Sequence, residues 1–200
     1  KGKMMETNIG HALKGKRVAV LMTDGVEQVE YTQPRSFLEE HGAIVTLISP
    51  KNKGEQVQGK NHNDNGDTFT VEMDVRDAKP GNFDALVLPG GEENPKKLRE
   101  SAEAIDFIRQ FALEHKPIAA ICHGPLALID AGIAQARHLT SWPESKGELV
   151  EAGAEWSDEA VVIDDKLITS RKPADIPAFN EALYKELRID AQVADMGPSS

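Results

Sequence analysis

Short apolar runs alternate with amphipathic stretches along most of this chain. Four runs are apolar at nearly every position and too short for helices, which is typical of strands buried on both faces. These runs span residues 17–22, 44–48, 85–89 and 117–121. In other stretches apolar residues recur at helical spacing, in 26–41, 104–112 and 176–187. The alternation predicts an α/β domain whose mostly parallel sheet carries helices on both faces.

Two segments interrupt this alternation. Residues 56–76 alternate in polarity around a polar stretch at 61–66, which predicts a hairpin-like excursion. Residues 161–170 predict a second hairpin that turns at 164–166. Pro34 falls inside the first amphipathic stretch, where it is expected to kink or restart the helix.

The pattern contains no repeat, no low-complexity block and no convincing linker. We therefore expect a single domain over residues 17–190. The segments 1–16 and 191–200 are expected to be flexible ends, because they are polar or follow the last strong apolar periodicity.

Composition narrows the class of protein. Hydrophobic residues make up 40% and charged residues 28% of the 200 positions, as in ordinary globular proteins. The formal net charge of −10 argues against a nucleic-acid partner and against an anionic membrane surface. No apolar run approaches the roughly 20 residues of a membrane span, and the first residues lack the apolar core of a signal peptide. A single cysteine cannot form an internal disulfide. We therefore expect a cytoplasmic protein with no membrane association.

Unusual residues follow three of the predicted strands. They are Thr23–Glu27, the pair Gly90–Gly91, and Cys122–Pro125. Ligands of such sheets bind outside the carboxyl ends of the strands, so these three segments are expected to converge on one site.

Cys122 lies between a strand and a helix, where a sharp turn would expose its side chain. The following helix N-terminus would lower the pKa of the thiol and favour a reactive thiolate. The alternative is an inert cysteine that fills space in the core. His123 is a candidate base or orienting group. The backbone N–H groups of His123 and Gly91 are candidates for an oxyanion hole, although a glycine pair also serves tight turns.

Glu27 lies at the predicted start of the first helix and allows two interpretations. It is either a first-turn acid stabilised by the helix dipole, or a carboxyl group beside Cys122 that hydrogen-bonds the sulfur. The second role requires a protonated carboxyl, with its pKa raised by burial and by the thiolate.

Four segments together resemble the PfpI family of intracellular cysteine peptidase-like stress proteins. They are Ala85–Gly91, Lys116–Pro125, Thr140–Trp142 and Ser170–Asp175. That family is related to the parkinsonism-associated protein deglycase and to the class I glutamine amidotransferases. The resemblance runs from about Arg17 to Arg188 and implies a flavodoxin-like three-layer sandwich.

The resemblance also implies roles for individual residues. Cys122 would be the nucleophile, with His123 and Glu27 beside it and Gly91 as an oxyanion donor. It implies no cofactor and no metal. It further implies a homo-oligomer, with a dimer favoured, that acts on a small carbonyl compound or a peptide.

The chain departs from the peptidase-like pattern after the glycine pair. Those relatives carry an acidic residue after a proline, and this acid completes a Cys-His-acid triad at a neighbouring subunit's active site. Here Lys96 follows Pro95 at that place, and Glu92 or Glu93 stands at a different distance from the proline. An imidazole without an orienting carboxylate loses much of its catalytic power.

The leading hypothesis is therefore a stress-protective cysteine-dependent hydrolase of the PfpI type, with weak or absent peptidase activity. One alternative is a deglycase or glyoxalase that acts on methylglyoxal or its adducts. Another is a non-enzymatic redox sensor or chaperone that uses oxidation of Cys122. An amidotransferase is disfavoured, because residues 171–175 contain no histidine.

Overall fold

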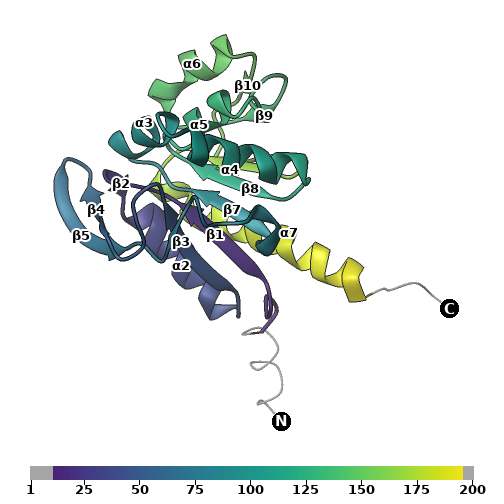
Figure 1. The fold of residues 1–200 in the computed structure, drawn as a ribbon. Helices are drawn as coiled ribbons and strands as arrows, with labels where there is room; N and C mark the ends of the chain where they lie inside the picture. The colour runs from purple at the N-terminus through teal and green to yellow at the C-terminus, as the bar shows by residue number, and fades with distance from the viewer. Residues whose placement is uncertain (1–10, 196–200) are drawn as a thin grey trace.

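The structure, a computed structural model, describes residues 11–195 of the chain, with side chains through Arg188. A seven-stranded sheet forms its centre, in the order β11-β12-β8-β7-β1-β3-β6 (Figure 1). Every neighbouring pair is parallel except β11 and β12. The strands are β1 (Arg17–Leu21), β3 (Ile44–Ser49), β6 (Met73–Asp74), β7 (Ala85–Leu88), β8 (Ile118–Ile121), β11 (Val162–Asp164) and β12 (Leu167–Ser170).

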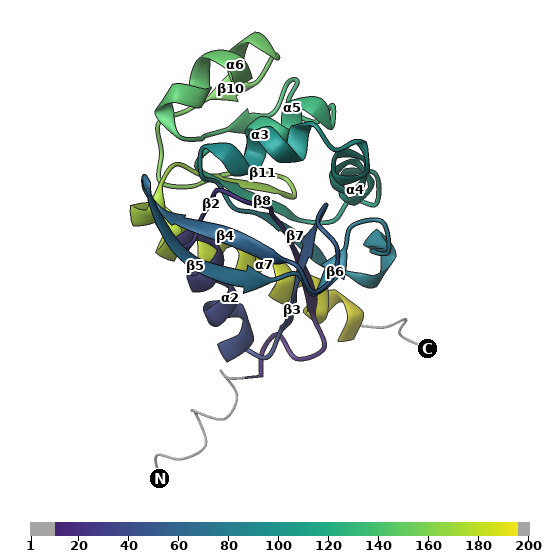
Figure 2. The ribbon, with the colours of Figure 1, turned by 60° about the vertical axis from the view of Figure 1, so that its left-hand side comes forward.

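Helices cover both faces of this sheet (Figures 1 and 2). One face carries α2 (Val29–Glu40) and α7 (Ile176–Asp195), which also contact each other. The opposite face carries α3 (Glu93–Arg99), α4 (Ala102–Leu113) and α5 (Leu126–Asp130). The predicted α/β architecture, a mostly parallel sheet between two helical layers, is confirmed.

Smaller elements complete the fold. A three-stranded sheet contains β2 (Val26–Glu27), β4 (Gln56–Asn61) and β5 (Asp64–Thr70). A two-stranded sheet pairs β9 (His138–Leu139) with β10 (Glu155–Trp156), next to α6 (Lys146–Glu151). Short 3-10 turns lie at Pro80–Asn82, Pro143–Ser145 and Pro173–Asp175.

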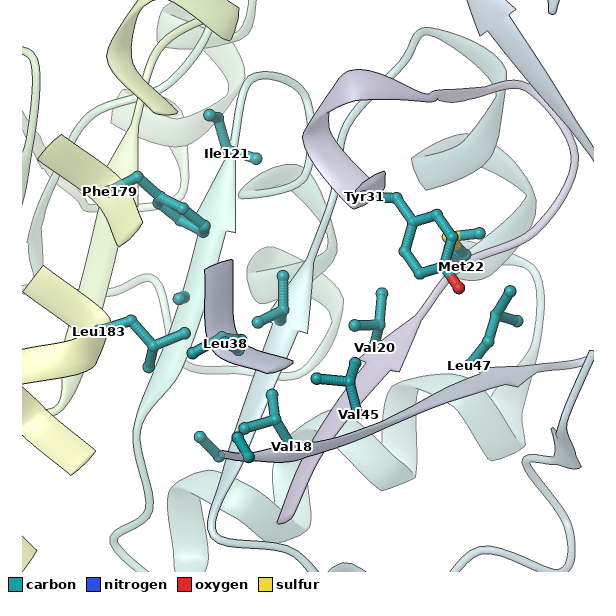
Figure 3. Packing of buried hydrophobic residues seen from close by; sticks show 14 of the residues in the cluster. Val18, Val20, Met22, Tyr31, Leu38, Val45, Leu47, Ile121, Phe179 and Leu183 are labelled. Carbon is teal, nitrogen blue, oxygen red and sulfur yellow. The ribbon is translucent and has the colours of Figure 1, made fainter. Parts of the chain in front are cut away.

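Alternate residues of β1 enter two separate cores. Val18 and Val20 pack in the layer under α2 and α7, where Phe179 and Leu183 of α7 approach the sheet (Figure 3). Ala19 and Leu21 pack in the opposite layer. Because side chains alternate across a strand, this two-sided burial explains why the strands are apolar at consecutive positions.

Both predicted hairpins are present, β4–β5 and β11–β12. The predicted start of the first helix was wrong. Residues 26–27 form strand β2, which pairs with β4, and the helix begins only at Val29. Pro34 is buried inside α2 and does not interrupt it.

The predicted domain limits also need correction. Leu13 is fully buried in the core, inside the segment that was expected to be flexible, and its N–H donates to the carbonyl of His41. At the other end α7 continues past residue 190 to Asp195. The rest of the predicted flexible ends, residues 1–10 and 196–200, lies outside the described residues.

The strand order creates a switch point at the centre of the sheet. From β1 the chain moves to β3 on one side, and it later returns to β7 on the other side. Crevices of open α/β sheets form at the carboxyl ends of strands at such a point. In the described part of the chain, no helix combines the length and apolar character needed to cross a bilayer.

Packing of α7 on the sheet predicts that a buried leucine contributes much more to the free energy of unfolding than an exposed leucine. Leu183→Ala removes a side chain that is 1% exposed, so we expect it to lower the free energy of unfolding by about 2–5 kcal/mol. Leu113→Ala, at a site that is 71% exposed, should change it by less than about 0.5 kcal/mol. Denaturant unfolding measures both, and equal effects would contradict this packing.

Candidate active site

Cys122 follows β8 on a sharp turn with left-handed backbone. Its φ of +63° is unusual for a residue other than glycine and costs on the order of 1–3 kcal/mol. Two hydrogen bonds hold it: its N–H donates to Ser170 O at 3.0 Å, and its carbonyl accepts from Trp142 N at 2.8 Å. The turn predicted from the sequence is therefore present. Hydrogen bonds to Ser170 and Trp142 hold its strained backbone in place.

Polar groups surround the Cys122 sulfur. The distance from Sγ to Nδ1 of His123 is 3.3 Å, so this histidine points toward the thiol although it is adjacent in sequence. The backbone N–H groups of Gly91 and His123 also interact with the sulfur. The imidazole stacks on Trp142, with ring centroids 5.8 Å apart at 27°. The stacking restricts the orientation of the ring.

The carboxyl group beside the thiol belongs to Glu30, in the first turn of α2. Its side chain is fully buried and interacts with Cys122. Oε1 accepts from the N–H of Gly90 at 2.9 Å, whereas Oε2 has no conventional hydrogen-bond partner among the described residues. Burial raises the pKa of Glu30 to about 8, against the opposing effect of the Gly90 hydrogen bond. Glu30 is therefore mainly protonated at neutral pH.

Glu27, which the sequence suggested for this place, lies at the edge of the same pocket. Its two carboxylate oxygens accept from the N–H of His62, at 3.1 and 3.2 Å. Its carboxylate thus holds the tip of the β4–β5 hairpin. The assignment failed because α2 begins at Val29, so the first-turn acid is the glutamate three positions later, Glu30. The only sequence signal for Glu30 was this second glutamate in Val26–Glu30.

The predicted lowering of the thiol pKa is also wrong. Burial raises the pKa of Cys122, and the charge of an ionised Glu30 raises it further, against the N–H groups of Gly91 and His123. Helix α5 is only five residues long and begins at Leu126, so its dipole is weak. The two acids titrate as a pair, because ionisation of one disfavours ionisation of the other. A thiolate is consequently accompanied by a protonated Glu30.

A cavity of about 280 Å³ opens over Cys122. It brings together all four residues that the sequence singled out, Cys122, His123, Gly91 and Glu27. Seven further residues line it: Glu30, His62, Asn63, Glu92, Trp142, Glu144 and Pro173. Of these, Trp142 and Pro173 belong to the Thr140–Trp142 and Ser170–Asp175 segments of the sequence resemblance, and Glu92 is one of the two acids considered after the glycine pair. Across the described residues, no group of three or more potential ligands could hold a metal ion.

Because residues 90 and 91 are glycines, their segment can lie close to the turn at Gly25 and to the turn at Cys122. A Cβ at residue 90 would lie 2.7 Å from the Cβ of Cys122, and one at residue 91 would lie 2.2 Å from Gly25 O. The buried side chain of Asn94 joins the same segments. Its Oδ1 accepts from Thr23 N at 2.7 Å, while Nδ2 donates to Pro89 O and Gly90 O at 3.1 and 3.0 Å.

Lys96, at the place where the sequence resemblance implies an acid, projects from α3 into solvent. Its Nζ lies 3.8 Å from Oε1 of Glu93. The pKa of His123 is lowered, chiefly by burial and also by Lys96, while Glu92 and Glu144 act in the opposite direction. No carboxylate among the described residues hydrogen-bonds the imidazole.

Comparison with known proteins identifies the family. Residues 16–186 match the DJ-1/PfpI family profile. The chain belongs to the DJ-1/PfpI family. General stress protein 18 of Bacillus subtilis is 40% identical over 167 residues, covering 83% of this chain and 94% of that protein. Protein/nucleic acid deglycase 2 of Escherichia coli is 41% identical over 170 residues, covering 84% and 96%.

A solved structure supports the same conclusion. The chain resembles Drosophila melanogaster DJ-1beta with a TM-score of 0.78 and 28% identity, over 92% of this chain and 99% of that one. The DJ-1/PfpI match contains every residue that lines the cavity, from Glu27 to Pro173. The flavodoxin-like sandwich implied by the sequence resemblance is confirmed.

The raised pKa of Glu30 predicts how stability depends on pH. We compare Cys122→Ser with Cys122→Ser/Glu30→Gln, so that the thiol does not titrate. A buried carboxyl binds its proton more tightly in the folded than in the unfolded state. The free energy of unfolding of the single variant should therefore fall, relative to the double variant, between pH 4.5 and about 8. The slope should approach about 1.4 kcal/mol per pH unit. A constant difference measured by urea unfolding would refute a raised pKa.

Close contacts at Gly91 predict a local effect of one methyl group. Gly91→Ala introduces a Cβ at φ +91° against Gly25 O, so the N–H that faces the sulfur must move. We expect a loss of at least about 1 kcal/mol in stability and slower alkylation of Cys122 by iodoacetamide. Gly81→Ala is the control, because a Cβ there has no atom within 4 Å. If both variants behave alike, the contact at Gly91 is unimportant.

Proposed function

We propose that the protein is a stress-protective cysteine-dependent hydrolase of carbonyl adducts of amines and thiols, with little peptidase activity. The observation that carries this proposal is the arrangement around one sulfur. Cys122 has His123 Nδ1 at 3.3 Å, the N–H groups of Gly91 and His123 beside it, and the buried carboxyl of Glu30 in contact. A nucleophile, a proton acceptor and two oxyanion donors thus share one cavity.

In a methylglyoxal adduct the amine or thiol is bonded to the carbon next to the ketone. The adduct must therefore first isomerise to a lactoyl amide or thioester, as its C–H proton moves to the ketone carbon and its hydroxyl proton to the ketone oxygen. The thiol proton then passes to His123, and the sulfur attacks the lactoyl carbonyl carbon, which now carries the amine or thiol. A bond forms between Sγ and this carbon, and the π electrons of the carbonyl move to its oxygen. The N–H groups of Gly91 and His123 can then donate to the oxyanion. When the carbonyl re-forms, the bond from its carbon to the amine or thiol breaks, and the imidazolium gives its proton to this leaving group. Water then attacks the same carbonyl carbon, the bond to Sγ breaks, and lactate and the free thiol of Cys122 are formed.

Peptide bonds are poor substrates for this arrangement. A departing peptide amine must be protonated, which requires an imidazolium that is stable and oriented. Burial and Lys96 lower the pKa of His123, and among the described residues no carboxylate holds its ring. The thiol of a carbonyl adduct leaves more easily and depends less on this proton.

The names of two relatives support this proposal. One is named a general stress protein and another a deglycase, at 40% and 41% identity. By the same family relationship we propose a homodimer in the cytoplasm that needs no cofactor.

A second candidate function rests on Glu30. A protonated carboxyl in contact with a cysteine can donate to a sulfinate, which would make Cys122 a redox sensor. Peroxide supplies the oxygen in that case, and each added oxygen consumes one peroxide. Oxidation that stops at two added oxygens per chain would favour this function, if turnover of adducts is absent.

Hydrolysis of carbonyl adducts and cleavage of peptides can be compared in a side-by-side assay. Wild-type protein is expected to release amine or thiol from methylglyoxal adducts, and to cleave peptides at least about a hundredfold more slowly. Cys122→Ser should abolish the first activity, because a neutral hydroxyl lacks the nucleophilicity of the thiolate. Lys96→Glu should leave adduct hydrolysis within about threefold. Robust Cys122-dependent peptide cleavage, or adduct loss that survives in Cys122→Ser, would refute the proposal.

A further inference from the structure

The cavity over Cys122 is unusually rich in carboxylates. Glu27, Glu92 and Glu144 line it together with the buried Glu30, and no lysine or arginine is among the described residues that line it. Glu30 is mainly protonated at neutral pH, so the negative charge comes from the other three. The carboxylate of Glu27 accepts from the N–H of His62, whereas in the described part of the chain Glu92 and Glu144 line the cavity without such a bond to the hairpin.

Glu92 and Glu144 line the same cavity as Cys122 and His123, so their charges act on the reacting group. Both carboxylates raise the pKa of His123, whose Nδ1 lies 3.3 Å from the sulfur. The cation that opposes them, Lys96, is exposed and lies 3.8 Å from Glu93. Arg171 lies two residues before Pro173, which lines the cavity. Its guanidinium forms ion pairs with Asp158 and Asp175.

We infer that the cavity selects its substrates by charge, with Glu92 and Glu144 as specificity-determining residues. Neutral and positively charged carbonyl compounds enter, whereas compounds that carry a carboxylate or phosphate near the carbonyl are excluded. This inference deepens the proposed function and rests on it for the substrates. The same charges act on any electrophile that approaches Cys122, so selectivity can be measured without turnover.

The physical basis is repulsion in a partly enclosed site. Low-dielectric walls focus the field of like charges, and salt screens it over roughly 8–10 Å at physiological ionic strength. The net charge of −10 acts in the same direction at longer range. We therefore expect discrimination of roughly tenfold or more at low salt, which falls as salt is added.

The test compares two alkylating reagents of similar size, neutral iodoacetamide and anionic iodoacetate, on the full chain at pH 7. The measured quantity is the ratio of their rates at Cys122, divided by the same ratio for a free thiol. Wild-type protein should show a normalised ratio of at least roughly ten at low salt. Glu92→Gln/Glu144→Gln should lower this ratio at least threefold, and so should high salt.

The matched control is Glu40→Gln, an exposed glutamate at the end of α2 outside the cavity, which should leave the ratio unchanged. A normalised ratio near one in wild-type protein would overturn the inference. A high ratio that persists in the double variant would also overturn it, because discrimination would then come from burial alone.

A turnover arm separates this inference from the proposed function. Methylglyoxal hemithioacetals of thiocholine, a cationic thiol that lacks a primary amine, and of mercaptoacetate, an anionic thiol, are compared by kcat/KM. We expect preference for the thiocholine adduct, reduced in the double variant. Turnover of neither adduct would refute the proposed function, while the alkylation ratios would still decide the charge selectivity.

Discussion

The contact between Cys122 and the buried carboxyl of Glu30 constrains the rest of the site. Two acids in contact away from water cannot both ionise readily, so burial and mutual repulsion raise both pKa values. The contact also needs space, which exists because residue 90 is glycine and leaves its Cβ position to the two side chains. The N–H of Gly90 then satisfies one oxygen of the carboxyl group.

The fold supplies this contact from segments distant in sequence. Cys122 follows β8, Glu30 lies in the first turn of α2, and Gly90 follows β7, all at the carboxyl edge of the sheet near its switch point. Asn94 joins the turn after β1 to the turn after β7, because its buried amide accepts from Thr23 N and donates to Pro89 O and Gly90 O. The left-handed backbone of Cys122 is tolerated because hydrogen bonds from two neighbouring segments hold it.

The carboxyl groups of the cavity have different roles because their surroundings differ. Full burial makes Glu30 a weak acid that stays protonated near the sulfur. Glu27 accepts from the single N–H of His62 and so fastens the β4–β5 hairpin. Glu92 and Glu144 influence the imidazole of His123 through their charge, opposed by Lys96. Environment, rather than residue type, decides which glutamate takes part in chemistry and which sets the field around it.

The sequence by itself determined the layered sheet, both hairpins and the convergence of three strand ends on Cys122, because apolar periodicity and chain order encode these features directly. It also predicted His123 and Gly91, which line the cavity over Cys122. It did not determine that Glu30 rather than Glu27 touches the sulfur, since that depends on where α2 begins, and pairing of Val26–Glu27 with β4 decides this point. The direction of the thiol pKa was likewise decided only by tertiary structure. A helix N-terminus is visible in a sequence, whereas burial and a neighbouring acid arise from segments that meet only in the folded chain.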